Sequence, residues 1–180
     1  MGTLIAVRMT ATDFDALPDD GESKRELIDG EVFEMASGGP VHERVKSNAH
    51  REVVLWGGRE FDFLVQSETR YYLNEIDIYQ PDVSIVLGST LDPQKRGKIT
   101  IAPVVAIEIV SSEPAARLQH KIKAMLAAGT RVVVVVYPEE RSVFLYRTGR
   151  VEQLSESDTL ALDDVLPGFA VPVSALFQGI

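Results

Sequence analysis

The sequence predicts a single α/β domain over residues 1–180, in which a mixed central β-sheet is flanked by helices. Segments with strand patterns alternate along the chain with two long segments of helical periodicity, an order typical of this class. The run from Val132 to Val136 is apolar without interruption, as expected for a strand that is covered on both faces. With 180 residues, 45% of them hydrophobic, the chain can form one sizeable core.

The N-terminal part predicts a short helix and a β-hairpin. Residues 10–13 have the composition of a helix N-cap, and the helix should stop at Pro18. Residues 25–28 and 32–35 then flank the dipeptide Asp29-Gly30, a two-residue hairpin signal in which glycine tolerates a positive φ.

The next segment predicts a long helix followed by strands. Apolar residues recur at helical spacing from Pro40 to Trp56, and Gly57-Gly58 should end this helix. Residues 61–73 are expected to form one long strand. A turn near Asn74-Glu75 then leads into a strand pair that includes Asp82.

The second half of the chain predicts a strand, a helix and a terminal hairpin. The strand covers residues 104–110, and Ser111 or Ser112 can cap a helix over 113–128. After the strand at 132–136, residues 143–146 and 151–154 should pair as a hairpin. The remaining apolar residues are expected to complete the core: Leu160, Leu162, Leu166, Phe169 and Leu176.

Composition limits the possible functions. The chain has no cysteine, which rules out a disulfide framework, a thiolate zinc site and a cysteine nucleophile. The N-terminus lacks a signal-peptide pattern, and no apolar run approaches the roughly 18 residues needed to cross a bilayer. We therefore expect a cytoplasmic protein with no membrane partner.

The charge is unevenly distributed along the chain. The net charge of −9 argues against a surface that binds nucleic acid by charge alone. Residues 61–150 nevertheless carry 11 basic and 10 acidic side chains, whereas residues 151–180 carry none and five. A polynucleotide would therefore approach over the basic residues of the central segment, which are Arg70, Lys95, Arg96, Lys98, Arg117 and Lys121.

Two acidic residues at the ends of apolar runs are the strongest candidates for chemistry. Pro81-Asp82 precedes the apolar run 83–87, and Glu108 lies near the end of the run 104–110. A buried carboxylate is costly without a partner, and a divalent cation is the simplest partner that two of them could share. The alternatives are that Asp82 ends a turn after proline and that Glu108 faces solvent.

The order of these motifs resembles the PD-(D/E)XK nuclease superfamily and, within it, the Uma-type family of putative restriction endonucleases. The resemblance extends over nearly the whole chain and rests on 26–31, His42, Pro81-Asp82, 105–111, Lys121, Gly129, 166–169 and 176–177. It implies a restriction-endonuclease-like fold and metal-dependent hydrolysis of phosphodiester bonds, in DNA as the leading substrate.

The resemblance also implies roles for individual residues. Asp82 and Glu108 would bind Mg²⁺ or Mn²⁺, with the carbonyl of Ile109 as a third ligand. The superfamily usually has a lysine two residues after the second acid, where this chain has Val110, and Lys121 on the next helix matches the place from which related families supply it.

Other matched positions have simpler explanations as well. Glu31 would approach the metal through a water or be an exposed hairpin residue, and His42 would relay protons, cap its helix or pack. Lys121 could instead be a solvated helix lysine.

Two departures from the family pattern weaken the transfer of the family's function to this chain, and the acidic composition leaves a further alternative open. Arg117 stands where the family usually has an aspartate, and residues 132–134 replace an acidic and aromatic stretch. The alternatives are a catalytically silent nuclease-fold module and a metal-dependent hydrolase of small phosphate esters. Nucleases of this fold often act as homodimers, but nothing in the sequence locates an interface.

Overall fold

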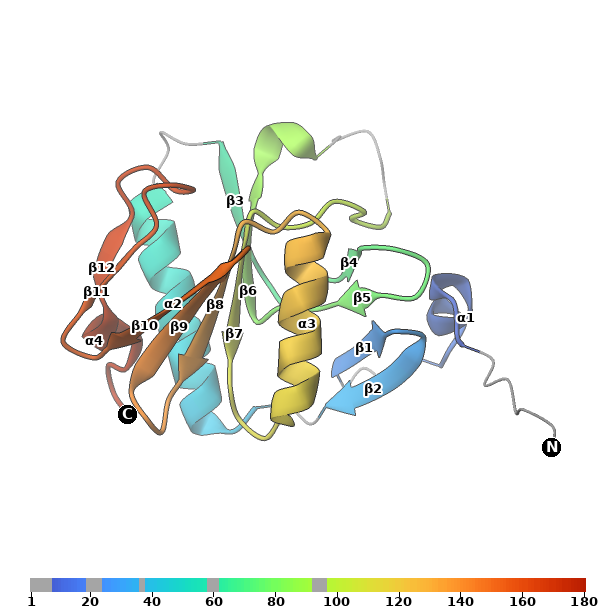
Figure 1. Ribbon diagram of the computed structural model, residues 1–180, viewed down its shortest axis with the longest axis horizontal. Helices are drawn as coiled ribbons and strands as arrows, with labels where there is room; N and C mark the ends of the chain where they lie inside the picture. The colour runs from blue at the N-terminus through green and yellow to red at the C-terminus, as the bar shows by residue number, and fades with distance from the viewer. Residues whose placement is uncertain (1–7, 19–23, 36–37, 58–61, 92–96) are drawn as a thin grey trace.

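A six-stranded mixed sheet forms the centre of the computed structural model, which describes residues 8–18, 24–35, 38–57, 62–91 and 97–180 (Figure 1). Its strand order is β10-β9-β8-β7-β6-β3, in which β7 and β8 are parallel and the other neighbours antiparallel. The bounds are β3 Phe63–Ser67, β6 Val83–Leu87, β7 Val105–Ile109, β8 Val132–Tyr137, β9 Ser142–Arg147 and β10 Arg150–Ser155. The mixed α/β fold class predicted from the sequence is confirmed.

Two helices cover opposite faces of this sheet. Helix α2, Pro40–Gly57, packs Val45, Ala49 and Val53 against the odd-numbered residues of β7 and the even-numbered valines of β8. Helix α3, Ala115–Ala127, packs Leu118 and Ile122 against the opposite side chains of the same strands. Because side chains alternate along a strand, β7 and β8 are buried on both faces, which explains their continuous apolar sequence.

The predicted hairpin is present but belongs to a second, smaller sheet. Strands β1, Lys24–Ile28, and β2, Glu31–Met35, pair around Asp29 and Gly30, whose φ values are +53° and +78°. This sheet has the order β2-β1-β5-β4, with β4 at Tyr71–Tyr72 and β5 at Ile78–Tyr79. It lies beside α3 (Figure 1).

The single long strand expected over residues 61–73 is wrong. The segment contributes β3 to the large sheet and β4 to the small one. Glu68, between them, has a φ of +50°, a left-handed conformation that interrupts a strand. Residue 61 lies outside the described part of the chain.

The N-terminal caps predicted from the sequence are present at α1 but not at α3. Helix α1, Ala11–Asp15, has the expected cap, because the Thr10 and Asp13 side chains each accept a hydrogen bond from the other residue's backbone N–H. Neither Ser111 nor Ser112 caps α3, whose N-cap residue is Pro114 and which lacks a capping side-chain hydrogen bond.

The C-terminal segment closes over α2. It consists of β11 (Thr159–Ala161), β12 (Ala170–Pro172) and α4 (Val173–Leu176). Elsewhere in the chain, a short 3-10 helix, η1 (Gly88–Thr90), follows β6. The buried Asn48 amide on α2 donates to the carbonyls of Leu176 and Gln178 at 2.9 and 3.0 Å, which fixes this end of the chain. Within the described ranges, no helix is both long and apolar enough to cross a membrane.

Candidate functional site

Strand register brings the two predicted acidic residues together. Val83 at the start of β6 pairs with Ile107 of the antiparallel strand β7. Asp82 precedes Val83, and Glu108 follows Ile107, so the two acids lie side by side on the sheet. Both are buried, with exposures of 3% and 4%. The side chain at 108 alternates away from the α2 face and therefore points toward α3.

Both oxygens of the Asp82 carboxylate have partners. Oδ1 accepts a hydrogen bond from Lys24 Nζ at 2.9 Å, and Oδ2 accepts one from the backbone N–H of Ile109 at 2.8 Å. His42 Nε2 lies 3.2 Å from Oδ2. Burial by itself raises the pKa of Asp82, but the hydrogen bond to His42 and the charge of Lys24 outweigh it and hold that pKa well below its usual range. Asp82 is therefore an anion at neutral pH.

Lys121 connects the second carboxylate to a third. Its Nζ lies 2.9 Å from Glu108 Oε2 and 2.8 Å from Glu26 Oε1, and the three side chains are at most 6% exposed. Burial lowers the pKa of Lys121, but attraction to Glu108 and Glu26 raises it by more. The expectation that Lys121 reaches inward to the carboxylates agrees with this geometry, whereas a solvated lysine does not.

More carboxylates than ammonium groups converge on this point. Burial raises the pKa of Glu108 to about 8, although the charge of Lys121 opposes the shift. Glu108 Oε1 and Glu26 Oε2 are buried and have no hydrogen-bond partner within the described residues. The site therefore has buried carboxyl oxygens whose ionisation is costly without a further positive charge, which is an environment that favours an added cation.

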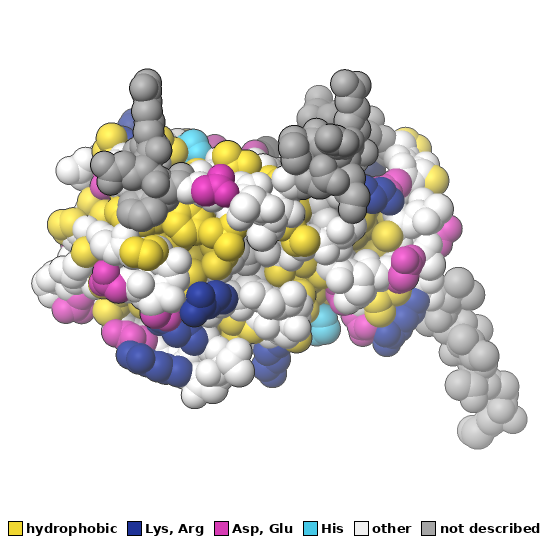
Figure 2. Space-filling view, turned by 90° about the horizontal axis from the view of Figure 1, so that it is seen from above, with side chains coloured by type: hydrophobic (Ala, Val, Ile, Leu, Met, Phe, Trp, Pro, Cys, Tyr) yellow, Lys and Arg dark blue, Asp and Glu magenta, His cyan; other side chains and the backbone are white. Residues whose placement is uncertain are grey.

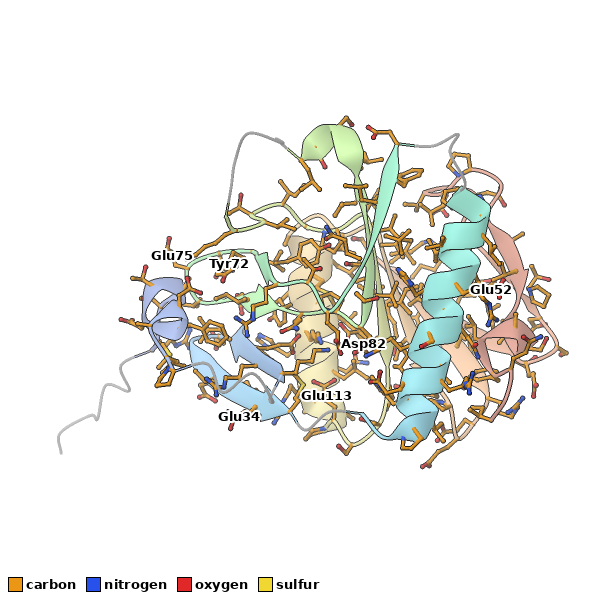
Figure 3. All side chains as sticks on the ribbon, turned by 180° about the vertical axis from the view of Figure 1, so that it is seen from behind. Glu34, Glu52, Tyr72, Glu75, Asp82 and Glu113 are labelled. Atoms are coloured by element: carbon orange, nitrogen blue, oxygen red, sulfur yellow. The ribbon has the colours of Figure 1, made fainter. Side chains whose placement is uncertain are left out.

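A cavity of about 520 Å³ lies beside these groups, with lining residues from α2, α3 and the β1–β2 hairpin. Lys24, Asp82, Glu108 and Lys121 lie on its wall, together with Glu113 and Arg117 from the start of α3. In Figure 3, Asp82 lies between the two long helices and Glu113 lies near the lower end of α3. Burial raises the pKa of Glu113, whose Oε1 is also without a partner in the described structure.

His42 reaches Asp82 because a glycine lies against its ring. A Cβ at Gly38 would fall 2.1 Å from His42 Nδ1, so any larger residue there would displace the imidazole. The hydrogen bond to Asp82 raises the pKa of His42, while burial acts in the opposite direction. The imidazole thus lies in the cavity wall rather than serving as a helix cap.

Glu31 does not lie at the cavity. It pairs with Ile28 at the turn of the hairpin and is exposed, so of the two states considered for it the structure shows the exposed hairpin residue. Within the matched segment 26–31, the acid that contacts Lys121 is Glu26. Lys24, on the same strand as Glu26, contacts Asp82. Sequence reasoning missed both. The available signal was that Lys24 and Glu26 share a face of their strand with Ile28, an apolar residue that packs in the α3 core.

Among the described residues, several of the basic side chains expected to guide a polynucleotide are engaged within the fold. Lys98 pairs with Asp15, and Arg70 lies over the Phe14 ring. Lys121 is buried, and residues 95 and 96 lie outside the described ranges. On the face shown in Figure 2, basic side chains are interspersed with acidic, hydrophobic and uncharged ones. Arg117 and Lys121 both line the cavity, and the Arg117 guanidinium lies 4.1 Å from the Phe33 ring centroid.

The residues present suit a hard divalent cation with few protein ligands. No group of three or more His, Asp or Glu side chains converges closely enough to hold a metal among the residues that the structure describes. Mg²⁺ is commonly bound through one or two carboxylates, with waters completing its octahedron. Asp82 and Glu108, with an unpartnered oxygen on Glu108, meet that smaller requirement.

Comparison with known proteins identifies the class. The model of the Uma2 family, described as putative restriction endonuclease, matches residues 11–174, and the chain belongs to this family. A search of curated proteins gave no match.

A solved structure has the same fold. The crystal structure of a putative nuclease belonging to DUF820 from Anabaena variabilis ATCC 29413 superposes with a TM-score of 0.84. The match covers 94% of this chain and 98% of that one at 21% sequence identity. The restriction-endonuclease-like fold expected from the sequence is therefore confirmed.

Proposed function

We propose that this protein is a metal-dependent endonuclease that hydrolyses phosphodiester bonds in DNA. The observation that carries the proposal is the convergence of Asp82, Glu108 and Lys121 in one cavity, where register places the two acids side by side and Lys121 lies 2.9 Å from Glu108. Membership of a family described as putative restriction endonucleases supports the same reaction class.

Asp82 and Glu108 would hold Mg²⁺ or Mn²⁺. The N–H of Ile109 already points to Asp82, and because the N–H and carbonyl of one strand residue face the same side, the Ile109 carbonyl is the natural third ligand. When bound, the ion lowers the pKa of a coordinated water and offsets the charge that develops on the phosphate oxygens.

The remaining side chains act on the water and the phosphate. Lys121 would orient the attacking water from its position against Glu108, and its ammonium would stabilise charge on the phosphorane. Arg117 and Lys24, on the cavity wall, would attract the phosphate backbone. His42 would hold Asp82 in place and exchange protons with solvent.

A nuclease assay tests this function. Plasmid and linear DNA would be incubated with magnesium, with manganese, and with chelator, using wild type, Asp82→Asn and Glu108→Gln. We expect cleavage by the wild type with either metal, and loss in both variants and in chelator. Glu31→Gln is the matched control, because this exposed acid lies outside the cavity lining. Equal cleavage by wild type and Asp82→Asn would refute the assignment.

A catalytically silent module is the second candidate, and one observation favours it. Each Asp82 oxygen already has a partner, and Lys24 supplies a cation without any metal. Calorimetric titration with manganese separates the two, since a silent module of this kind would bind none. A panel of small phosphate esters tests the third possibility raised by the acidic composition.

A further inference from the structure

A second cavity adjoins the catalytic one. It has a volume of about 340 Å³, within the size range of small-molecule pockets. Its lining comes from the start of α2, the segment after β7 and the turn after β8: Gly39, Val41, His42, Val110, Ser111 and 137–140. His42 and Ser111 line both cavities, so a ligand that occupies the catalytic cavity can extend directly into this one.

The walls of the second cavity suit a flat ring. Val41 and Val110 supply aliphatic surface, and Tyr137 supplies an aromatic ring. The Tyr137 ring meets Phe144 edge-on, with centroids 5.4 Å apart and planes at 72°. Contact with Phe144 restricts the ring without covering the whole side chain, which remains half-buried. Tyr137 belongs to the cavity lining, and a partly exposed ring held in this way can serve as a stacking platform for a planar heterocycle.

Both cavities are lined by acidic side chains, but they differ in the basic side chains that accompany these acids. Lys24, Arg117 and Lys121 line the catalytic cavity, whereas the described lining of the second cavity includes Glu139 and Glu140 and no lysine or arginine. Both glutamates are exposed at the β8–β9 turn. A phosphate would be repelled there. A neutral ring with N–H donors would instead find acceptors, as an amino group of cytosine or adenine finds a carboxylate.

We propose that the second cavity is a nucleobase subsite, which takes the base adjoining the scissile phosphate. The base stacks on Tyr137, and its exocyclic amino group donates to Glu139 or Glu140. A base in a duplex is stacked and paired, so occupancy requires a single strand or a base turned out of the helix. The inference rests on the proposed nuclease function and names its preferred substrate as unpaired DNA with an amino-bearing base at the cleavage position.

Binding of short fluorescent oligonucleotides tests the subsite without requiring turnover. Anisotropy would be measured with single-stranded dC and dT oligomers and a mixed-sequence duplex, with calcium in place of magnesium. We expect the wild type to bind dC more tightly than dT, and a single strand more tightly than the duplex. Tyr137→Ala should weaken dC binding by about 5- to 100-fold, the effect of removing one stacked base contact.

Matched variants separate the ring from the fold. Tyr137→Phe keeps the ring and should bind like wild type. Tyr146→Ala removes another aromatic from the same face of the sheet, since Phe144 stacks on Tyr146 at 6.4 Å, but Tyr146 does not line the cavity. It should also bind like wild type. The double variant Glu139→Gln, Glu140→Gln should lose the preference for dC over dT while retaining its thermal unfolding midpoint.

The outcomes distinguish failure of the subsite from failure of the function. If the wild type cleaves DNA with magnesium but Tyr137→Ala binds dC normally, the subsite is wrong and the nuclease assignment stands. Tighter binding of the duplex, unaffected by Tyr137→Ala, overturns the subsite in the same way. If the wild type neither binds nor cleaves any of these DNAs, both proposals fall.

Discussion

Replacement of Glu108 by glutamine should change how the stability of the metal-free protein depends on pH. Glu108 is buried and has a pKa raised from 4.5 to about 8, whereas in the unfolded chain it regains the ordinary value. At pH values between these two pKa values, Glu108 keeps its proton in the folded state but has lost it in the unfolded state. The free energy of unfolding therefore falls as the pH rises, by about 1.4 kcal/mol per pH unit. Glutamine cannot ionise and removes this contribution.

The difference between the two proteins isolates this effect. From pH 5.5 to 7.5, the stability of Glu108→Gln relative to wild type should increase by on the order of 2 kcal/mol, because this interval lies between the unfolded and folded pKa values of Glu108. The hydrogen bond to Asp82 raises the pKa of His42, but His42 is present in both proteins, so its contribution largely cancels in the difference. If the glutamine amide changes stability through its contact with Lys121 by an amount that does not depend on pH, that amount also cancels when the stability differences at two pH values are compared.

Urea unfolding followed by circular dichroism, in chelator at three pH values, measures the difference. Glu31→Gln serves as the control for loss of an exposed carboxylate and should track the wild type. Saturating manganese should reverse the result, because binding to the folded state stabilises wild type but not a variant that lacks the ligand. A stability difference that stays constant from pH 5.5 to 7.5 would refute the argument that Glu108 is held protonated by burial.

Further predictions concern the side chains around the two acids. Lys121→Met should lower the cleavage rate by about 100-fold in single-turnover assays without weakening manganese binding, because the ammonium acts on water and phosphate. Lys24→Met should tighten manganese binding on the order of tenfold by calorimetry, since Lys24 occupies Asp82 Oδ1 in the free protein. Gly38→Ala should displace His42 and destabilise the protein by about 1–3 kcal/mol in thermal unfolding, as overpacking does. Unchanged stability in Gly38→Ala, or manganese binding weakened in Lys24→Met, would contradict these contacts.

Local sequence signals determined much of the fold. Asp29-Gly30 specified a hairpin because both residues accept positive φ, and the valines of β8 specified a strand covered on both faces. Asp82 and Glu108 could be recognised because each interrupts an apolar segment, where an unpartnered charge is costly. These inferences depend on a few neighbouring residues, whose conformational preferences and burial are set mainly by local pattern.

Tertiary structure alone decided how the site is completed. Lys24 and Glu26 reach Asp82 and Lys121 only because the small sheet packs beside α3, and Lys24 lies 58 residues from Asp82 in the sequence. The same packing leaves Glu31, on the other strand, exposed at the turn. Side-chain periodicity gives the face of a strand but not what that face meets. Contacts between segments far apart in the chain depend on register and packing, which local pattern does not encode.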